Sequence, residues 1–396
     1  MATPEIRFEG FEGEWPKPVL GSMGKTYGGL SGKTKEDFGH GDANFITYMN
    51  VFSNPISNPA MVGKTKIDKS QNQVISGDVL FTVSSETPEE VGMSSVVEEV
   101  RGITYLNSFC FGFRPQIKID NNFLAHALRS PSVRKDFTLL AQGISRFNIS
   151  KSKAMEIGLS LPQGTEQNIV GSYFRRLSEI IDMTSERVKN FTLLKQSMLA
   201  KMFPQGGASV PEIRFEGFTG DWEEDALENL VTRKTQAGFD NSLPRVEYED
   251  IISHAGRLNK NIYSKKSQKV GILFESGDII YGKLRPYLGN WILADFTGIA
   301  VGDFWVLRGG KLLPSFLFAM IQSTSFKQVT QITTGSKMPR ADWPVTSKHP
   351  FLYPSSAEQA AIGSYFRQLD QLIELEEAKL AKLTQLKTAF LSKMFV

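Results

Sequence analysis

The sequence predicts an α+β fold: two similar mixed α/β domains separated by two long helices that form an antiparallel coiled coil, with a pseudo-twofold internal repeat. A first observation is a segment that occurs twice, as EQNIVGSYFRRLSEII over 166–181 and as EQAAIGSYFRQLDQLI over 358–373. A second is that another segment, earlier in each half, is also repeated. A third is that short apolar runs separated by turn residues fill the chain between the repeats. Repeats of this length indicate that the chain consists of two halves with the same architecture.

Composition limits the class of protein. The chain has 396 residues, of which 41% are hydrophobic and 22% are charged, as expected for globular domains with real cores. The formal net charge is only +3, so nucleic-acid binding has to be argued from where the basic residues lie. The single cysteine, Cys110, lies in the apolar run FCF, which indicates a core role. The sequence shows no signal peptide and no run long enough to span a membrane, so we expect a cytoplasmic protein.

Each half opens with a short repeated segment. Residues 4–15 read PEIRFEGFEGEW and residues 211–222 read PEIRFEGFTGDW, with 10 of 12 positions identical. We interpret each segment as a short surface arm that docks on the helix before it.

The segments that follow indicate strands, turns and two short helices. In the first half, 45–51, 78–83 and 108–113 read as strands, and 123–129 and 133–141 read as short helices, the first halted by Ser130-Pro131. The second half repeats this sketch at 276–281, 304–307 and 316–321, with different residues between the shared runs. Two domains with one core and different loops are expected to bind two different targets by one geometry.

Both repeated helices carry a coiled-coil seam. Apolar residues recur in steps of four and three, and both helices are polar at the same two seam positions, Thr184 with Glu376 and Lys195 with Lys387. Proline precedes each helix, at Pro162 and Pro354, which marks the helix starts. Each rod is expected to be roughly 55 to 60 Å long. A core helix packed only on its own domain is the alternative.

Matching seams predict that the two helices pair with each other. An antiparallel pair places the two domains at opposite ends, whereas a parallel pair would crowd them together. B-DNA advances about 34 to 36 Å per turn, so such a rod could hold two domains over sites about one turn apart.

The order domain, long helix, domain, long helix, with Pro, Glu-Gln and Gly-Ser-Tyr-Phe at each helix start, resembles the specificity subunit of type I restriction-modification enzymes. The resemblance implies target recognition domains at 1–160 and 205–352 and spacer helices at 161–204 and 353–396. It also implies a noncatalytic subunit that reads a bipartite, asymmetric sequence in double-stranded DNA. Two modification subunits with S-adenosylmethionine would methylate adenine, and restriction subunits would use ATP and Mg²⁺.

No catalytic or metal site is expected in the chain itself. Three Gly-Lys-Thr tripeptides lack the preceding glycine of a phosphate-binding loop, and the four histidines are far apart in the sequence. We therefore expect no cofactor and no catalytic residue in this chain.

Candidate DNA contacts lie in the polar stretches between the shared core runs. Lysine and arginine bind phosphates, and arginine, lysine, asparagine and glutamine also read base edges. Ordinary solvated charges are the alternative for each single residue. In the first domain the candidates are Lys25, Tyr27, Lys33, Thr47, Tyr48, Asn50, Gln142, Ser145 and Arg146. In the second domain they are Arg233, Lys234, His254, Arg257, Lys260, Lys265, Lys266, Lys283, Arg285, Tyr287, Ser336, Lys337 and Arg340.

Residues repeated at the helix starts are candidates for contact with the two modification subunits, because twofold partners need the same patch twice. Helix capping and surface solvation are the alternatives for the Glu and Gln. The candidates are Glu166, Gln167, Ser172, Tyr173, Glu358, Gln359, Ser364 and Tyr365. A structural adaptor that joins two protein partners is the rival function. Different loops on a common core favour DNA recognition, because a twofold adaptor would repeat its binding loops as well.

Overall fold

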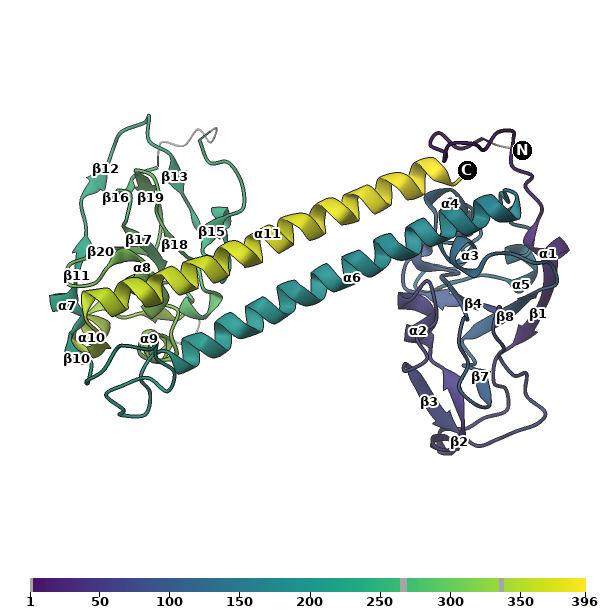
Figure 1. The fold of residues 1–396 in the computed structure, drawn as a ribbon, viewed down its shortest axis with the longest axis horizontal. Coiled ribbons are helices and arrows are strands. Elements are labelled where there is room, and N and C mark those ends of the chain that lie inside the picture. Colours follow the sequence, from purple (N-terminus) through teal and green to yellow (C-terminus); the bar gives the residue numbers. More distant parts are fainter. Residues whose placement is uncertain (1–2, 264–268, 335–337) are drawn as a thin grey trace. The chain divides into compact units, whose positions relative to one another are not determined.

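The computed structural model describes residues 3–263, 269–334 and 338–396. The chain divides into two compact units (Figure 1). Unit 1 comprises residues 1–184 and 379–396, and unit 2 comprises residues 185–378. Each unit therefore contains one globular domain, the first part of one long helix and the last part of the other.

The two long helices are α6 (Gly164–Lys201) and α11 (Ser356–Met394). In unit 1 the Nζ atom of Lys387 donates to Oγ of Ser178 at 2.8 Å. In unit 2 the Nζ atom of Lys195 lies 2.6 Å from Oδ1 of Asp370. The offset of 192 residues exchanges the two pairs, so both units have the same helix register. Within each unit the residue numbers rise along one helix as they fall along the other, and the predicted antiparallel pairing is confirmed.

Both globular domains are built on the same four-stranded antiparallel sheet. The strand order is β1-β8-β4-β6 in unit 1 and β11-β20-β17-β18 in unit 2. Register is also shared, since Phe81 pairs with Phe111 as Tyr281 pairs with Trp305. The bounds are β1 (Gly24–Gly28), β8 (Cys110–Pro115), β4 (Val79–Thr82), β6 (Ser94–Val96), β11 (Val231–Lys234), β20 (Phe304–Gly309), β17 (Ile279–Gly282) and β18 (Trp291–Leu293).

A second sheet in each domain contains one parallel pair, β2 with β7 and β13 with β19. Two-stranded ribbons complete the domains. The second sheets comprise β2 (Phe38–Ile46), β3 (Val62–Thr65) and β7 (Thr104–Leu106), and β12 (Ala237–Gly238), β13 (Arg245–Val246), β16 (Gly271–Phe274) and β19 (Gly298–Ala300). The ribbons are β5 (Ser84–Ser85) with β9 (Phe147–Asn148), β10 (Glu223–Ala226) with β23 (Pro350–Tyr353), β14 (Ile251–Ile252) with β15 (Arg257–Leu258), and β21 (Thr333–Thr334) with β22 (Arg340–Ala341).

Short helices connect the strands, and two of them lie in matching places in each domain. The predicted helices near 123–129 and 133–141 are α3 (Asn121–Ala127) and α4 (Pro131–Leu139), and their counterparts are α8 (Pro314–Met320) and α9 (Thr324–Thr330). The remaining short helices are α1 (Leu20–Met23), α2 (Tyr48–Ser53), α5 (Lys151–Ala154), α7 (Leu227–Leu230), α10 (Trp343–Lys348), η1 (Lys35–Asp37), η2 (Pro88–Glu90), η3 (Tyr248–Asp250) and η4 (Pro286–Leu288).

The predicted strand over 45–51 is wrong beyond its first two residues. Strand β2 ends at Ile46, and α2 follows it. The side chain of Thr47 accepts a hydrogen bond from the backbone N–H of Asn50, so Thr47 caps α2. An N-cap of this kind satisfies a helix-start donor and favours the helix over a continued strand.

The core of each domain includes side chains from both long helices. In unit 1, Phe174 of α6 and Phe395 beyond α11 pack with Phe123, and in unit 2, Phe203 and Phe366 pack with each other. Cys110 is buried, and burial raises the pKa of its thiol to about 12, which confirms the predicted core role. Among the described residues, no helix is long and apolar enough to cross a membrane.

Candidate nucleic-acid interface

The repeated helix-start motif in unit 1 holds the opening segment of the chain. Nε and Nη2 of Arg7 donate to the two carboxylate oxygens of Glu166 at 2.7 and 2.8 Å. This bidentate hydrogen bond raises the pKa of Arg7. Gln167 accepts from the backbone N–H of Asp120 at 3.1 Å and donates to the carbonyl oxygen of Pro162 at 2.8 Å. Both helix residues therefore serve to join elements of the unit.

Unit 2 repeats these contacts. Arg214 donates from Nε and Nη2 to Glu358, both at 2.7 Å, and the indole N–H of Trp222 donates to the same carboxylate at 3.3 Å. Gln359 accepts from the backbone N–H of Leu313 at 2.8 Å and donates to the carbonyl oxygen of Pro354 at 3.0 Å. Each repeated segment thus docks on the start of the long helix that follows it. The predicted docking on the preceding helix is limited to the second segment, where the backbone N–H of Ile213 donates to the carbonyl oxygen of Lys201.

The prediction that the repeated Glu and Gln form an exposed partner-binding patch is wrong. Glu166 and Glu358 are each 1% exposed, and Gln167 and Gln359 are buried as well. Tyr173 is half-buried, edge-on between Phe8 and Phe390, and Tyr365 packs edge-on against Phe215. Ser172 is exposed and Ser364 is half-buried.

A different repeated feature of α6 and α11 is exposed. Large apolar side chains occupy positions one residue before seam residues, and they recur at the 192-residue offset. In an antiparallel coiled coil these positions of the two helices lie on one flank. We call this surface the outer stripe: Ile180, Met183 and Leu386 in unit 1, and Leu372, Leu375 and Leu194 in unit 2.

The opposite flank of the helices faces the globular domain of the same unit. Residues one position after seam residues make these contacts: Ser178 lies 3.3 Å from Nε2 of His126, and Gly171 packs against the start of α3. The outer stripe therefore faces away from the domain. Apolar residues one position before the seam are the sequence signal for this surface.

Several predicted DNA-contacting residues of the first domain have structural partners. The hydroxyl of Tyr27 donates to Oδ2 of Asp78 at 2.7 Å, and Nζ of Lys33 lies 2.6 Å from Oδ2 of Asp68. Tyr48 donates to the carbonyl oxygen of Ser84 at 2.7 Å.

The prediction that Asn50 contacts DNA is wrong. Its side chain is 0% exposed and donates to the carbonyl oxygens of Asn58 and Met61 at 2.8 and 3.0 Å. A fully buried amide that bonds its own loop cannot reach a base edge, and Asn50 instead holds the turn after α2.

Four other predicted residues of the first domain are exposed. Lys25 lies on β1, and Gln142, Ser145 and Arg146 lie in one hairpin that follows α4. Backbone hydrogen bonds between Gln142 and Asn148, at 3.0 and 2.8 Å, close the base of this hairpin.

The predicted basic residues of the second domain are spread over several elements. Arg233 lies over the ring of Trp343, with Cζ 4.9 Å from the ring centroid, and Lys234 follows it on β11. His254 is exposed in the turn between β14 and β15, with φ of 63°. Arg257, on β15, binds the carboxylates of Glu374 and Glu377.

Three other basic residues of this domain are paired with acids. Nζ of Lys260 lies 2.9 Å from Oδ1 of Asp250, while Lys283 and Arg340 both contact Asp303. Arg285 and Tyr287 are exposed around η4. The candidates Lys265, Lys266, Ser336 and Lys337 lie outside the described residues.

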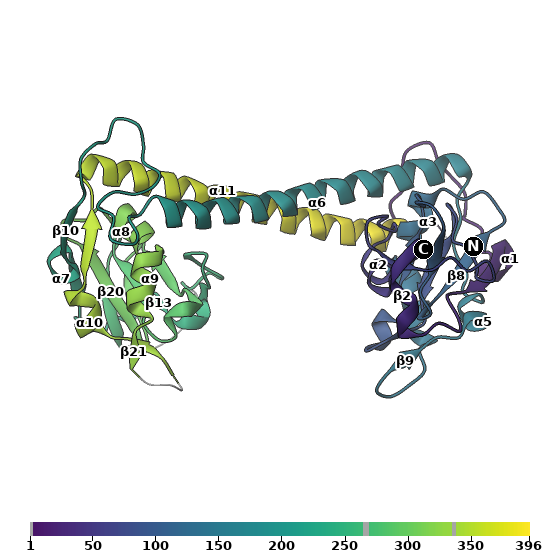
Figure 2. The ribbon, with the colours of Figure 1, turned by 90° about the horizontal axis from the view of Figure 1, so that it is seen from below.

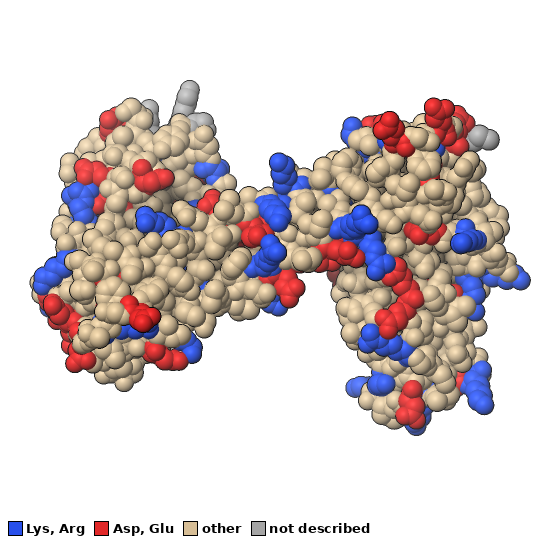
Figure 3. Space-filling model, in the orientation of Figure 1, with Lys and Arg blue, Asp and Glu red and all other residues tan. Residues whose placement is uncertain are grey.

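Charges of both signs are mixed on the surface. On the face shown in Figure 3, Lys and Arg alternate with Asp and Glu in each unit. DNA binding by this chain would therefore depend on particular loops, since no single large basic field covers that face.

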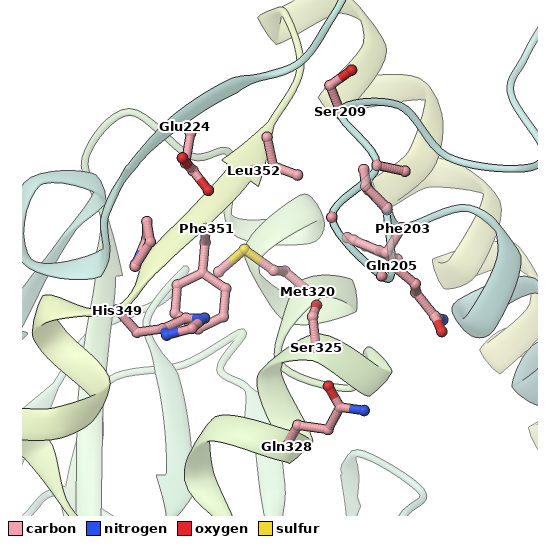
Figure 4. A pocket seen from close by; sticks show the side chains of 15 residues that line it. Phe203, Gln205, Ser209, Glu224, Met320, Ser325, Gln328, His349, Phe351 and Leu352 are labelled. Atoms are coloured by element: carbon pink, nitrogen blue, oxygen red, sulfur yellow. The ribbon is translucent and has the colours of Figure 1, made fainter.

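Two hollows lie among the described residues of unit 2. A cavity of about 360 Å³ lies between the loop after α6 and strand β23 and is lined by Gln205, Met320, His349 and Phe351 (Figure 4). A larger groove of about 1060 Å³ separates α11 from the β14–β15 hairpin and includes His254 and Arg257. Salt bridges from Arg257 cross this groove to α11, so it contains charges of both signs.

Comparison with known proteins shows which families have a similar sequence and architecture. Residues 219–385 match the model of the type I restriction modification DNA specificity domain. The first half repeats the fold of the second, with the same order of core strands. The chain is 22% identical over 264 residues to the type I restriction enzyme MjaVIII specificity subunit of Methanocaldococcus jannaschii, which covers 61% of either chain.

Two further relatives cover more of the chain. The StySPI specificity subunit of Salmonella potsdam is 21% identical over 84% of this chain and 77% of its own length. The EcoDI specificity subunit of Escherichia coli is 22% identical over 70% of both chains. The chain thus spans about three fifths to three quarters of the length of these relatives.

Solved structures share the fold. The crystal structure of the type I restriction-modification system S subunit from M. genitalium superposes with a TM-score of 0.65 at 15% identity, covering 100% of this chain and 99% of that one. A chain from a study of complex assembly and conformational transition of the type I R-M system gives a TM-score of 0.55 at 18% identity, covering 96% of both. The resemblance to type I specificity subunits, stated from the sequence, is confirmed.

Proposed function

We propose that this chain is the specificity subunit of a cytoplasmic type I restriction-modification enzyme, a noncatalytic protein that reads a bipartite, asymmetric sequence in double-stranded DNA. The observation that carries the proposal is the duplication itself. Both units have the same sheet order, the same helix register and the same buried contacts at the helix starts. The surface loops of the two domains differ, as two readers of different half-sites require.

Sequence readout is assigned to the loops of the two domains rather than to the shared framework. Arg146 and Gln142 in the first domain and Arg285 and Tyr287 in the second are exposed on loops or turns. Exposed arginine and glutamine can make paired hydrogen bonds to guanine and adenine edges in the major groove. Residues held in ion pairs, such as Lys33, serve mainly to shape these loops.

The outer stripe is the proposed docking surface for two modification subunits. It presents the same apolar residues twice, and a twofold pair of identical partners needs the same patch twice. Exposed apolar patches on otherwise polar surfaces mark interaction sites. Arg187 and Lys379 lie at equivalent positions next to the stripe, and Arg187 forms an ion pair with Glu376.

Chemistry is assigned to the partners. Modification subunits with S-adenosylmethionine would flip and methylate an adenine, and restriction subunits would use ATP and Mg²⁺. The role of this chain is to bring these activities to one sequence.

Selection from a random duplex library tests the proposal. The full chain is mixed with its modification subunits, bound duplexes are sequenced, and affinities are then measured by mobility shift at fixed salt. Two conserved half-sites separated by an unread spacer are expected. Enrichment of no sequence over random duplex would disprove DNA recognition and favour a protein adaptor.

A further inference from the structure

Two turns of the second domain place basic residues around one tryptophan. One is the turn between β14 and β15, which carries His254, and the other is η4, which is flanked by Arg285 and Gly289. The backbone N–H of His254 donates to the carbonyl oxygen of Gly289 at 2.9 Å, so the two turns are joined. The imidazole of His254 lies edge-on against Trp291, with the ring centroids 5.7 Å apart. The turns and the tryptophan therefore form one cluster in unit 2.

Both turns hold their basic residue in a strained backbone conformation. His254 has φ of 63° and Arg285 has φ of 48°, and no other non-glycine residue in the described ranges has a positive φ. This conformation is unfavourable for a residue with a Cβ atom and persists where surrounding contacts enforce it. A Cβ atom on Gly289 would lie 2.3 Å from Nδ1 of His254, so the two turns pack too closely for a side chain at that position. The cluster is thus positioned before any ligand binds.

Helix α9, which runs from the end of α8 to β21 (Figure 2), adds a third basic residue. It packs against η4, and Nζ of Lys327 lies 5.9 Å from the centroid of the Trp291 ring, near the outer limit of a cation–π contact. In the part of the chain that the structure describes, this ammonium group has no carboxylate or carbonyl partner. The buried indole N–H of Trp291 also lacks an acceptor there. Burial, together with the cation Lys195, lowers the pKa of Lys327, so an anion would stabilise its charged form.

The first domain has a cation in the equivalent place, but that cation is engaged. Arg134 follows the N-cap serine of α4 by four residues, as Lys327 follows the N-cap serine of α9. Arg134 donates to the carbonyl oxygens of Gly92 and Glu89, both at 2.8 Å, next to η2. An arginine that holds a turn in unit 1 is therefore replaced in unit 2 by a lysine that is available to a ligand.

Acids near the cluster are already paired with other cations. Oδ1 of Asp370 lies 2.6 Å from Nζ of Lys195, and Asp303 contacts Lys283. Neither carboxylate pairs with Lys327. An anion from outside the chain would therefore meet a cation whose charge is not neutralised.

We propose that Lys327 and His254 bind one backbone phosphate of the DNA duplex, and that this contact positions Arg285 to read the edge of a neighbouring base. This inference rests on the proposed function. Phosphate oxygens accept hydrogen bonds from ammonium groups and from imidazole N–H groups, and such contacts fix the register of a protein on the duplex. Burial lowers the pKa of His254, so at neutral pH its imidazole is an uncharged donor. The phosphate contact belongs to the second domain, because Arg134 is held by its own unit.

Uncharged phosphate analogues test this contact. The full chain with its modification subunits is titrated by mobility shift with its selected duplex, in which one phosphate at a time is replaced by a methylphosphonate. Lys327→Gln is expected to weaken binding about tenfold at about 0.1 M salt and to reduce the slope of log K against log salt by about 0.9. At one phosphate, in one half-site, the methylphosphonate should weaken binding by the wild type and leave binding by Lys327→Gln unchanged, because that contact is already lost.

Three further variants separate charge, position and base reading. Lys327→Arg keeps the charge and should keep the salt slope. Lys348→Gln is the matched control, because Lys348 is an exposed lysine on α10 of the same unit, and it should behave as the wild type in every measurement. Arg285→Gln should keep the methylphosphonate profile and relax the preference at one base pair.

Three results would overturn the proposal. If Lys327→Gln keeps the wild-type salt slope and methylphosphonate profile, Lys327 binds no phosphate, while sequence selection by the wild type leaves the proposed function intact. If the variant instead weakens binding of the modification subunits without DNA, Lys327 contacts protein. If the wild-type chain prefers no sequence over random duplex, the proposed function fails and the positioning role fails with it.

Discussion

The surroundings of Gly171 and Gly363 explain why the repeated helix-start motif contains a glycine. A Cβ atom on Gly171 would lie 2.3 Å from Oδ1 of Asp120 and 2.5 Å from the backbone nitrogen of Phe123. A Cβ atom on Gly363 would lie 2.3 Å from Oγ of Ser315. At both places the start of a short helix lies directly against the long helix, and the contact leaves no room for a side chain.

Replacing Gly171 with alanine is therefore expected to lower the free energy of unfolding by about 1–3 kcal/mol, because the added methyl overpacks a backbone contact. Urea unfolding of the full chain measures this. Gly164→Ala, in the first turn of the same helix, has open space around the new Cβ and is expected to be neutral or slightly stabilising. Equal effects at both positions would contradict the packing argument.

His126 makes unit 1 sensitive to acid. Burial, together with the nearby cations Lys387 and Arg129, lowers the pKa of its imidazole to about 4, although a hydrogen bond to the carbonyl oxygen of Asn122 opposes the shift. The unfolded chain has an ordinary histidine pKa near 6.5. Between these values the unfolded state binds more protons, so stability falls as the pH falls.

From pH 7 to pH 4, this residue is expected to remove about 3 kcal/mol from the free energy of unfolding. His126→Gln keeps a polar side chain without a titrating ring and should flatten that part of the pH profile. Chemical unfolding at half-unit pH steps gives both curves. A variant that loses stability as steeply as the wild type would show that other groups cause the acid effect.

At the scale of elements, the two units differ in the partner of the lysine in the helix seam. Lys195 faces Asp370 and also donates to Oε1 of Gln322 at 2.7 Å, whereas Lys387 faces Ser178. Burial lowers the pKa of Lys387, because its charge is only partly compensated. The same two positions thus hold an ion pair in unit 2 and a lysine–hydroxyl contact in unit 1.

Asp370→Ser gives unit 2 the pairing of unit 1 and is expected to destabilise the chain by about 2–3 kcal/mol, because Lys195 is left buried without its carboxylate. Ser178→Asp is the reciprocal change and is expected to stabilise by up to about 1 kcal/mol. Thermal and urea unfolding at low and high salt measure both. The essential result is that the two variants change the free energy of unfolding in opposite directions. If both variants lose stability, each unit is instead packed around the residue pair that it already has.

The outer stripe, also a feature of the long helices, can be tested by placing charges in it. Met183→Glu with Leu375→Glu places one charge on the equivalent position in each unit and is expected to weaken binding of modification subunits at least tenfold, since a charge would be buried at an apolar contact. Light scattering of the reconstituted complex measures stoichiometry.

Gln196→Glu adds the same charge to an exposed position on the other flank of α6 and should leave assembly unchanged. Full assembly of the double variant would remove the outer stripe from the proposed interface.

Periodicity predicted the long helices and their pairing because a seam is a local pattern. It did not predict that Glu166 and Gln167 are buried, because their partners, Arg7 and Asp120, are far away in the sequence. Asn50 was misassigned for a related reason, since the cap at Thr47 turned an expected strand into a helix and buried the amide.

At the scale of the whole chain, the repeated opening segments close both units in the same way. The backbone N–H of Ile213 donates to the carbonyl oxygen of Lys201 at the end of α6, and that of Ile6 donates to the carbonyl oxygen of Lys393 at the end of α11. One contact joins residues near in sequence and the other joins the two ends of the chain. The first and last elements are thereby built into one unit.

Shortening both helices tests whether they set the separation of the half-sites. Position 178 faces 387, and continuing that register along the sequence matches residues 181–187 of α6 with residues 378–384 of α11. Deleting both segments removes one heptad from each helix, keeps the seam in phase and retains both lysine contacts. Each helix shortens by about 10 Å, or about three base pairs of B-DNA.

The selected DNA is expected to keep both half-sites and to shorten its spacer by up to about three base pairs, as read by sequencing of duplexes bound to the reconstituted complex. Deleting 181–187 alone is the control, since it puts the seams out of register and should reduce stability. Altered half-sites would mean that the helices take part in base reading. An unchanged spacer would mean that the domains, and not the helices, fix the distance between the two sites.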